Sequence, residues 1–164
     1  MSILQGTILS EIEDDLLDKS YRMARKVLET GIGSHLRPFV IYKTFSDEKG
    51  IVPLSINLEK DLEDQNEEII KNLKELCRQK KVSDIYITIE MHRTFDENNL
   101  PVNKPEYYVF ITHESHLFSN MFASEIIMDE NDKLNVGPLF KIDEGIGKIG
   151  PFFNILCPLT FHSA

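Results

Sequence analysis

Histidine and carboxylate side chains are the groups in this chain whose types and spacing suit acid–base chemistry. Glu90 and His92 lie two positions apart in a segment that alternates polar and apolar residues, and Asp84 falls on the same side of it. Residues two apart on a strand share a face, so a carboxylate and an imidazole there suit proton transfer. Glu90 and His92 are therefore the candidate catalytic residues. Any half-exposed strand shows the same alternation, and the segment supplies neither a nucleophile nor an oxyanion donor.

A second group, His113, Glu114 and His116, follows the next predicted strand. Imidazole and carboxylate are zinc ligands, so these three are the candidate metal-binding residues. A metal site needs three or more convergent ligands, and His-Glu-Ser-His is not the helical His-Glu-x-x-His motif. In an antiparallel hairpin, His92 would lie at the loop end near Tyr107 and His113 at the opposite end. That geometry argues against one site that includes both.

Residues 145–150, Gly-Ile-Gly-Lys-Ile-Gly, match the G-x-G-x-x-G pattern. A dinucleotide-binding fingerprint also needs a strand before it, a helix that opens from it and an acidic residue about 20 positions later. Here Pro151 and the strand-like pair Phe152–Phe153 follow, and no such acidic residue appears. We interpret the glycines as a turn between strands and predict no cofactor.

The segment Val82–His92 is the element around which the fold is predicted to form. Ile85, Ile87, Ile89 and Met91 point one way, and polar residues alternate with them. Period-2 alternation with β-branched residues is typical of a strand that buries one face.

Other elements are predicted around this strand. Two amphipathic helices are expected at about 11–30 and from about 58 or 61 to 80, the first with Ser10 as its N-cap and Glu13 completing a capping box. Further strands are expected at 38–45, 51–56, 107–113, 121–128, 134–142 and 152–157, with Pro53 marking an edge strand and Gly50 taking a left-handed turn position.

This order predicts a single α+β domain over residues 1–164: a twisted, mainly antiparallel sheet of about five to seven strands, with two helices packed on one face. Residues 107–111 are apolar on both sides of their strand, so the second face should also be covered. Two helices on one face leave it open. A second copy of the chain, forming a homodimer through the sheet face, or strands that curl over are the predicted covers.

Composition limits the classes of partner. The formal net charge is −9 and the pI about 5.0, whereas a nucleic-acid binder usually carries a basic face, so we expect no nucleic acid and no membrane as partner. There is no long apolar run and no secretory signal, and the two cysteines lack metal-type spacing. These features favour a cytoplasmic protein with reduced thiols.

No convergent catalytic set emerges from the residues. The leading hypothesis is therefore a non-enzymatic binding or interaction module that works through its sheet face or through a polar loop predicted at 94–104. The alternative is a small hydrolase, with or without a metal ion, that uses the Glu and His residues named above at the sheet edge. An enzyme should bring several of them together in a pocket, whereas an interaction module should show an apolar patch with a polar rim.

Overall fold

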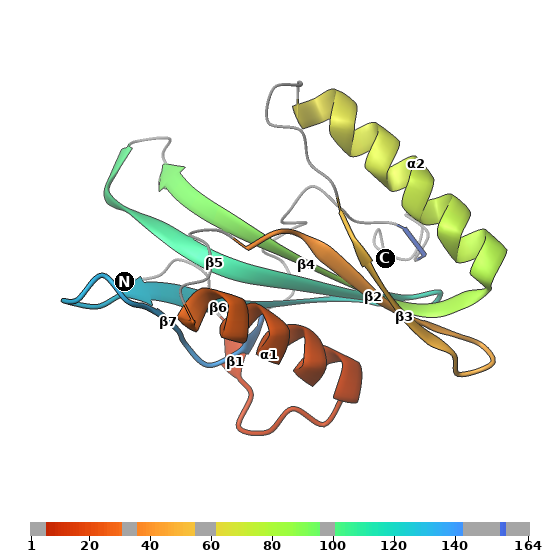
Figure 1. The fold of residues 1–164 in the computed structure, drawn as a ribbon, viewed down its shortest axis with the longest axis horizontal. Helices are drawn as coiled ribbons and strands as arrows, with labels where there is room; N and C mark the ends of the chain where they lie inside the picture. Colours follow the sequence, from red (N-terminus) through yellow and green to blue (C-terminus); the bar gives the residue numbers. More distant parts are fainter. Residues whose placement is uncertain (1–5, 31–35, 55–61, 96–100, 143–154, 157–164) are drawn as a thin grey trace.

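The computed structural model describes residues 6–30, 36–54, 62–95, 101–142 and 155–156, and for 62–64, 92–95 and 101–105 the backbone alone (Figure 1). Two helices and eight strands are described, in the order β1 (Gly6–Ile8), α1 (Asp15–Glu29), β2 (Phe39–Thr44), β3 (Lys49–Pro53), α2 (Leu62–Lys80), β4 (Val82–Phe95), β5 (Pro101–Ser115), β6 (Ser119–Met128), β7 (Leu134–Val136) and β8 (Phe140–Ile142). No described helix is both long and apolar enough to cross a membrane.

The strands form one sheet in the order β1-β8-β6-β5-β4-β2-β3, with β7 also paired to β6. Every described pairing is antiparallel, which confirms the α+β class and the mainly antiparallel sheet. The sheet has one strand more than the expected maximum. β4 lies in the interior of the sheet, between β5 and β2, as expected for the strand around which the fold forms, and β3, which contains Pro53, is an edge strand.

The two helices cover opposite faces of the sheet, so the prediction that both pack on one face is wrong (Figure 1). Ile85, Ile87 and Ile89 pack in one core cluster with Leu73 and Cys77 of α2. The alternate side of the same strand belongs to a second cluster, where Tyr86 packs with α1. Each fully buried isoleucine contributes about 1.5–3 kcal/mol, so the side of β4 that faces α2 stabilises the fold strongly.

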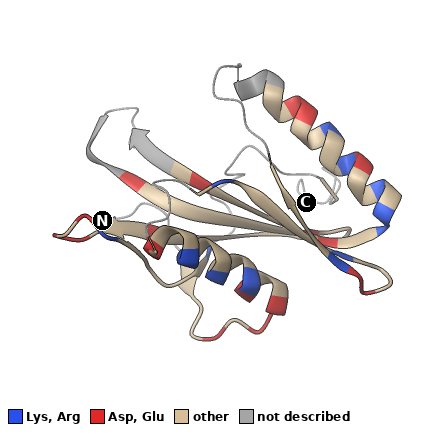
Figure 2. Cartoon of the chain, viewed as in Figure 1, with Lys and Arg blue, Asp and Glu red and all other residues tan. Residues whose placement is uncertain are grey.

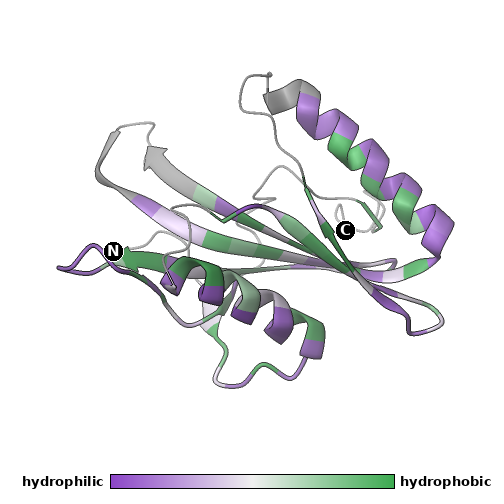
Figure 3. Cartoon of the chain, in the orientation of Figure 1, coloured by the Kyte–Doolittle hydropathy of each residue, from purple (hydrophilic) through white to green (hydrophobic). Residues whose placement is uncertain are grey.

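β5 shows why both faces are covered. Tyr108 and Phe110 belong to the cluster under α2, and Val109 and Ile111 to the cluster under α1, all at most 4% exposed. The expectation that this strand is covered on both sides is correct, but one helix per face supplies the cover. The argument for a second copy over an open sheet face therefore does not hold. Figure 3 shows the apolar centre of the sheet between helices whose outer sides are polar.

Helix α1 begins later than predicted. Asp14, not Ser10, is the N-cap, because its carboxylate accepts the backbone N–H groups of Leu16 and Leu17 at 3.0 and 3.2 Å. A capping carboxylate satisfies amides that have no partner in the first turn and complements the helix dipole. Residues 10–13 match the capping-box pattern, but the helix is capped by Asp14, which also accepts a hydrogen bond from Tyr86 of β4.

The β4–β5 hairpin is longer than predicted. Pairing continues to Phe95 and Pro101, so most of the predicted loop 94–104 is strand, and only 96–100 lies outside the described residues. In the β2–β3 turn the left-handed residue is Asp47 (φ 66°), not Gly50. Gly50 is instead required by close packing, because a Cβ there would lie 2.3 Å from the ring of Tyr42. The G-x-G-x-x-G motif and most of the predicted strand 152–157 lie outside the described residues.

Candidate functional site

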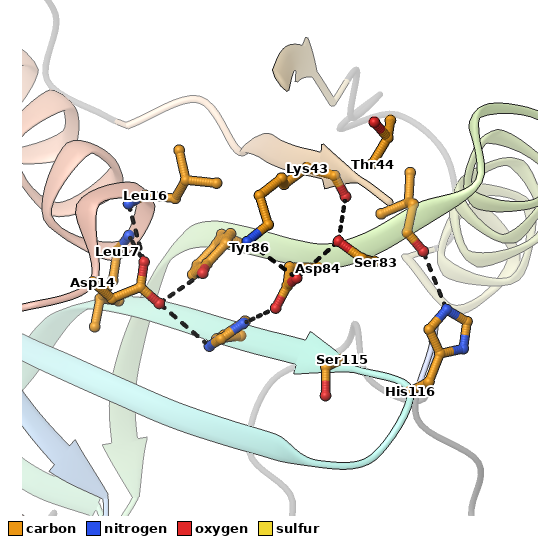
Figure 4. A network of polar contacts seen from close by, with 12 residues as sticks. Asp14, Leu16, Leu17, Lys43, Thr44, Ser83, Asp84, Tyr86, Ser115 and His116 are labelled. Atoms are coloured by element: carbon orange, nitrogen blue, oxygen red, sulfur yellow. Dashed lines mark hydrogen bonds and ion pairs between the residues drawn. The ribbon is translucent and has the colours of Figure 1, made fainter. Parts of the chain in front are cut away.

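A polar network lies where the N-terminus of α1 meets β4 and β5 (Figure 4). Its centre is His113, which pairs with Tyr86 across the hairpin. His113 Nε2 lies 2.8 Å from Asp84 Oδ1, and His113 Nδ1 lies 3.8 Å from Asp14 Oδ2. Both ring nitrogens therefore face carboxylates, one from β4 and one from the cap of α1.

Tyr86 closes the link between the helix and the sheet. Its hydroxyl donates to Asp14 Oδ2 at 2.6 Å, and its ring stacks on His113 with centroids 4.1 Å apart and planes 13° apart. Burial, and then the hydrogen bond to Asp14, raise the pKa of the Tyr86 hydroxyl, so it remains a donor. Asp14 thus accepts from α1 and from β4 at once, which fixes the position of the helix on the sheet.

Asp84 is held by β2 and by its neighbour as well as by His113. Lys43 Nζ lies 3.7 Å from Asp84 Oδ2, and Ser83 Oγ donates to the same oxygen at 2.9 Å. Burial is the largest influence and raises the pKa of Asp84, but hydrogen bonds from His113 and Ser83 and the charges of His113 and Lys43 together outweigh it. The pKa of Asp84 is therefore lowered, and the carboxylate form is stabilised by the fold.

The geometry indicates a structural role for His113, which connects β4 and β5 to the N-terminus of α1. It is 8% exposed, Tyr86 covers one face of its ring, and the edge contacts Phe118 at a centroid distance of 5.1 Å. A general base needs a ring nitrogen that can reach a substrate proton, and here each nitrogen already faces a carboxylate. No group of three or more His, Cys, Asp or Glu residues in the described ranges is placed to hold a metal ion.

The candidate metal ligands diverge. Glu114 follows His113 along β5 and so lies on the opposite face, where it is fully buried and accepts the Leu156 N–H at 3.1 Å. His116 is exposed, with Nε2 3.1 Å from the carbonyl oxygen of Val82. The structure brings none of these three side chains together.

The candidate catalytic residues lie farther along the hairpin. Glu90 is half-buried on the same face as Tyr86, four residues on, which is about 13 Å along a strand. His92 pairs with Tyr107, as the hairpin argument predicted, and its side chain lies outside the described residues. Asp84 does take part in a site, but with His113 and Asp14, a grouping that sequence reasoning missed.

The β2–β3 and β5–β6 turns lie beside this network, at the end of the sheet on the right of Figure 1, and carry exposed apolar side chains. Leu117 and Phe45 are 76% and 70% exposed, the highest values among the large hydrophobic residues described, and Phe118 is 42% exposed. Phe45 stacks on His116 with centroids 5.5 Å apart, so the β2–β3 and β5–β6 turns meet there. We call Phe45, His116, Leu117 and Phe118 the end surface.

Hydrogen bonds fix the two turns that carry the end surface. Ser115 Oγ accepts the N–H groups of Leu117 and Phe118 at 3.2 and 3.3 Å, which fixes the β5–β6 turn. The N–H of Phe45 donates to the carbonyl oxygen of Lys81 at 3.0 Å. The apolar side chains are thus exposed on ordered turns. Sequence reasoning missed this surface because Phe45 and Leu117 are 72 positions apart, and only strand register brings their two turns together.

The chain matches no protein-family model, no curated protein and no solved structure. The fold and the two features above define an α+β domain with a braced, exposed aromatic surface at one end of its sheet. Its function is therefore argued from those features.

Proposed function

We propose that the chain is a non-enzymatic interaction module that binds a protein partner through the end surface. One observation carries the proposal: the two most exposed large hydrophobic side chains, Leu117 and Phe45, come from two turns that lie together, because Phe45 stacks on His116, the residue before Leu117. Single exposed apolar residues are common, but a contiguous group on ordered turns is typical of a binding surface.

The bracing of the surface supports the same proposal. Binding costs free energy when flexible side chains must be ordered, and a surface that is ordered before binding avoids much of that cost. Ser115 fixes the turn that carries Leu117 and Phe118, and His113 packs against Phe118. Aromatic anchors in such positions dominate the energetics of many interfaces.

The place of binding differs from the one expected from the sequence. Over the central strands, α1 covers one face of the sheet and α2 the other, and the predicted loop 94–104 is mostly strand. We therefore propose that binding takes place at the end surface instead. We place the interaction in the cytoplasm, with neither nucleic acid nor membrane as partner. The acidic net charge and the free thiol of Cys77 support this.

Photo-crosslinking in cells tests the proposal. A photoreactive phenylalanine analogue replaces Leu117 in one variant, Phe45 in a second and the exposed Ile127 at a distance from the end surface in a control. We expect the same cross-linked protein from the first two positions and not from Ile127. This protein, once purified, should bind the wild type and fail to bind the variant F45S/L117S, which we call the end-surface variant. Cross-links only from Ile127, or none, would refute the proposal.

A hydrolase remains the second candidate because one observation favours it, the 2.8 Å contact between Asp84 and His113. An Asp–His pair of this kind orients an imidazole in many hydrolases. For catalysis, His113 Nδ1 would have to leave Asp14 and meet a substrate. The variant Asp14→Ala frees that nitrogen, so hydrolysis of activated esters that rises in this variant and vanishes in the double variant D14A/H113N would support the hydrolase. We expect neither.

A further inference from the structure

We propose that His113 couples the end surface to the docking of α1, so that release of the helix N-terminus loosens the β5–β6 turn. The proposal adds regulation to the end surface and in that respect rests on the proposed function, whereas the coupling itself is a property of the chain alone. Three features support it: the type of the turn, the contact of His113 with Phe118, and the contact of His113 with Asp14.

The β5–β6 turn depends on side-chain contacts for its conformation. Its loop has two residues, His116 and Leu117, because the N–H of Ser115 donates to the carbonyl oxygen of Phe118 at 2.9 Å. Loops of this length favour turn types with positive φ, yet neither loop residue is among the described residues with positive φ. The turn therefore relies on contacts of its side chains rather than on a turn type that suits the twist of the strands.

His113 supplies one of these contacts. The rings of His113 and Phe118 meet at 90° with their centroids 5.1 Å apart, an arrangement that aromatic pairs favour. Because Phe118 is 42% exposed, solvent surrounds much of its ring, and the contact with the buried His113 weighs more in fixing it. The position of the turn is therefore sensitive to the position of the imidazole.

The position of His113 depends in turn on α1. Asp84 of β4 holds Nε2 at 2.8 Å, and Tyr86 stacks on one face of the ring. The other nitrogen, Nδ1, lies 3.8 Å from Asp14 Oδ2, the same oxygen that accepts the Tyr86 hydroxyl. The Asp14 carboxylate also caps two amides of the first turn, so it moves with the helix. Undocking of α1 removes this carboxylate from both members of the stacked pair.

A coupling of this kind acts in both directions. If docking of α1 orders the turn, ordering of the turn favours docking by the same free energy. By holding Phe118, a protein bound at the end surface would stabilise the capped start of α1, and a change that displaces the helix would weaken the binding. The end surface is thus regulated from the sheet face that α1 covers.

Hydrogen exchange of single backbone N–H groups, measured by NMR on the full chain, tests the coupling. Asp14→Ala should raise the exchange rates of Leu117 and Phe118 about fivefold, since loss of an aromatic contact changes a local opening equilibrium by roughly that factor. Asp15→Ala, which alters an exposed acid that is not the cap, should leave both rates unchanged.

The β6–β7 turn provides an internal control. Asp129 Oδ1 accepts the N–H groups of Asn131 and Lys133 at 2.9 Å, so a side chain holds these amides as Ser115 holds those of the β5–β6 turn. The two turns lie at opposite ends of β6, and Figure 2 shows the acidic β6–β7 turn far from the β2–β3 turn. General destabilisation would raise exchange in both turns alike, whereas coupling through His113 raises it in the β5–β6 turn alone.

The reverse direction is measured at the helix cap. Phe118→Ala removes the ring that contacts His113 and should raise exchange of the capped N–H groups of Leu16 and Leu17. The matched control is Leu117→Ala, which shortens the neighbouring side chain, 76% exposed, and should leave both rates unchanged.

Three results would overturn the coupling: turn amides that do not respond to Asp14→Ala, an equal rise in the β6–β7 turn, or a cap that responds no more to Phe118→Ala than to Leu117→Ala. None of these measurements uses a partner protein. The coupling can therefore hold where cross-linking finds no partner, and cross-linking can succeed where the coupling fails.

Discussion

Replacing Asp14 by alanine should destabilise the protein by about 2–3 kcal/mol. Loss of an N-cap costs about 1 kcal/mol, and Asp14 caps two amides, those of Leu16 and Leu17. The change also removes the acceptor of the Tyr86 hydroxyl, and a buried donor without a partner costs about 1–3 kcal/mol. Tyr86 is 3% exposed, but the Asp14 side chain is 35% exposed, so water can fill part of the space and the total lies below the upper limit.

Urea denaturation followed by circular dichroism measures the free energy of unfolding of the variant. Asp15→Ala is the matched control, because Asp15 is an exposed acid in the first turn that is not the cap and should cost only about 0.3–1 kcal/mol. Asp14→Asn keeps one oxygen to cap the helix but replaces the oxygen that accepts the Tyr86 hydroxyl, so its cost should lie between those of Asp15→Ala and Asp14→Ala.

A double-mutant cycle isolates the contact between the helix and the sheet. The variants D14A, Y86F and D14A/Y86F should give a coupling energy of about 1–2 kcal/mol, since each single change removes the same hydrogen bond. If D14A costs no more than D15A, or if the coupling energy is zero, the network does not tie α1 to the sheet and the reasoning fails.

Three further predictions concern the described core and network. The fold lowers the pKa of Asp84 below its unfolded value of about 3.9. The Asp84 carboxylate therefore stabilises the fold above about pH 4, and this contribution is lost as pH falls through the lower folded pKa. The difference in free energy of unfolding between wild type and D84N, measured in urea, should shrink on acidification below about pH 4. Burial raises the pKa of the Cys77 thiol to about 12, so in a C157S background a thiol reagent should modify Cys77 only when the protein unfolds. Rapid labelling of the native protein would contradict the packing of Cys77 between α2 and the sheet. Ile87→Asp should abolish folding, because Ile87 is 2% exposed in the core, whereas Ile51→Asp on the edge strand, at 46% exposure, should leave a cooperative melting transition; a soluble Ile87→Asp protein with unchanged melting would mean that the faces of β4 are reversed.

The sequence predicted the elements that depend on local pattern. The alternation of isoleucines in β4 correctly identified a buried central strand, and the pairing of His92 with Tyr107 followed from an antiparallel hairpin. The other side of β4 was misjudged. Thr88 and Tyr86 have the polarity of a half-exposed face, yet both are buried, and Tyr86 packs with α1. Polarity alone does not tell a solvent face from one under a helix.

The candidate site depended on contacts between distant segments. Asp14 is 70 positions from Asp84, and only the docking of α1 places both beside His113. The three candidate metal ligands were close in sequence, but neighbours on a strand alternate between faces, and Glu114 was therefore carried away from His113. Spacing along the chain therefore grouped His113 with Glu114 and His116, whereas the fold groups it with Asp84 and Asp14.

The most direct test of the proposed role is a calorimetric titration of the purified cross-linked partner against three forms of the chain. The forms are the wild type, the end-surface variant and a control, I8S/I127S, that removes two exposed apolar side chains elsewhere. Loss of two aromatic or aliphatic anchors at the centre of an interface should weaken binding about 100-fold or more, with the control unchanged. Equal affinity of the wild type and the end-surface variant would show that the protein does not bind through Phe45 and Leu117.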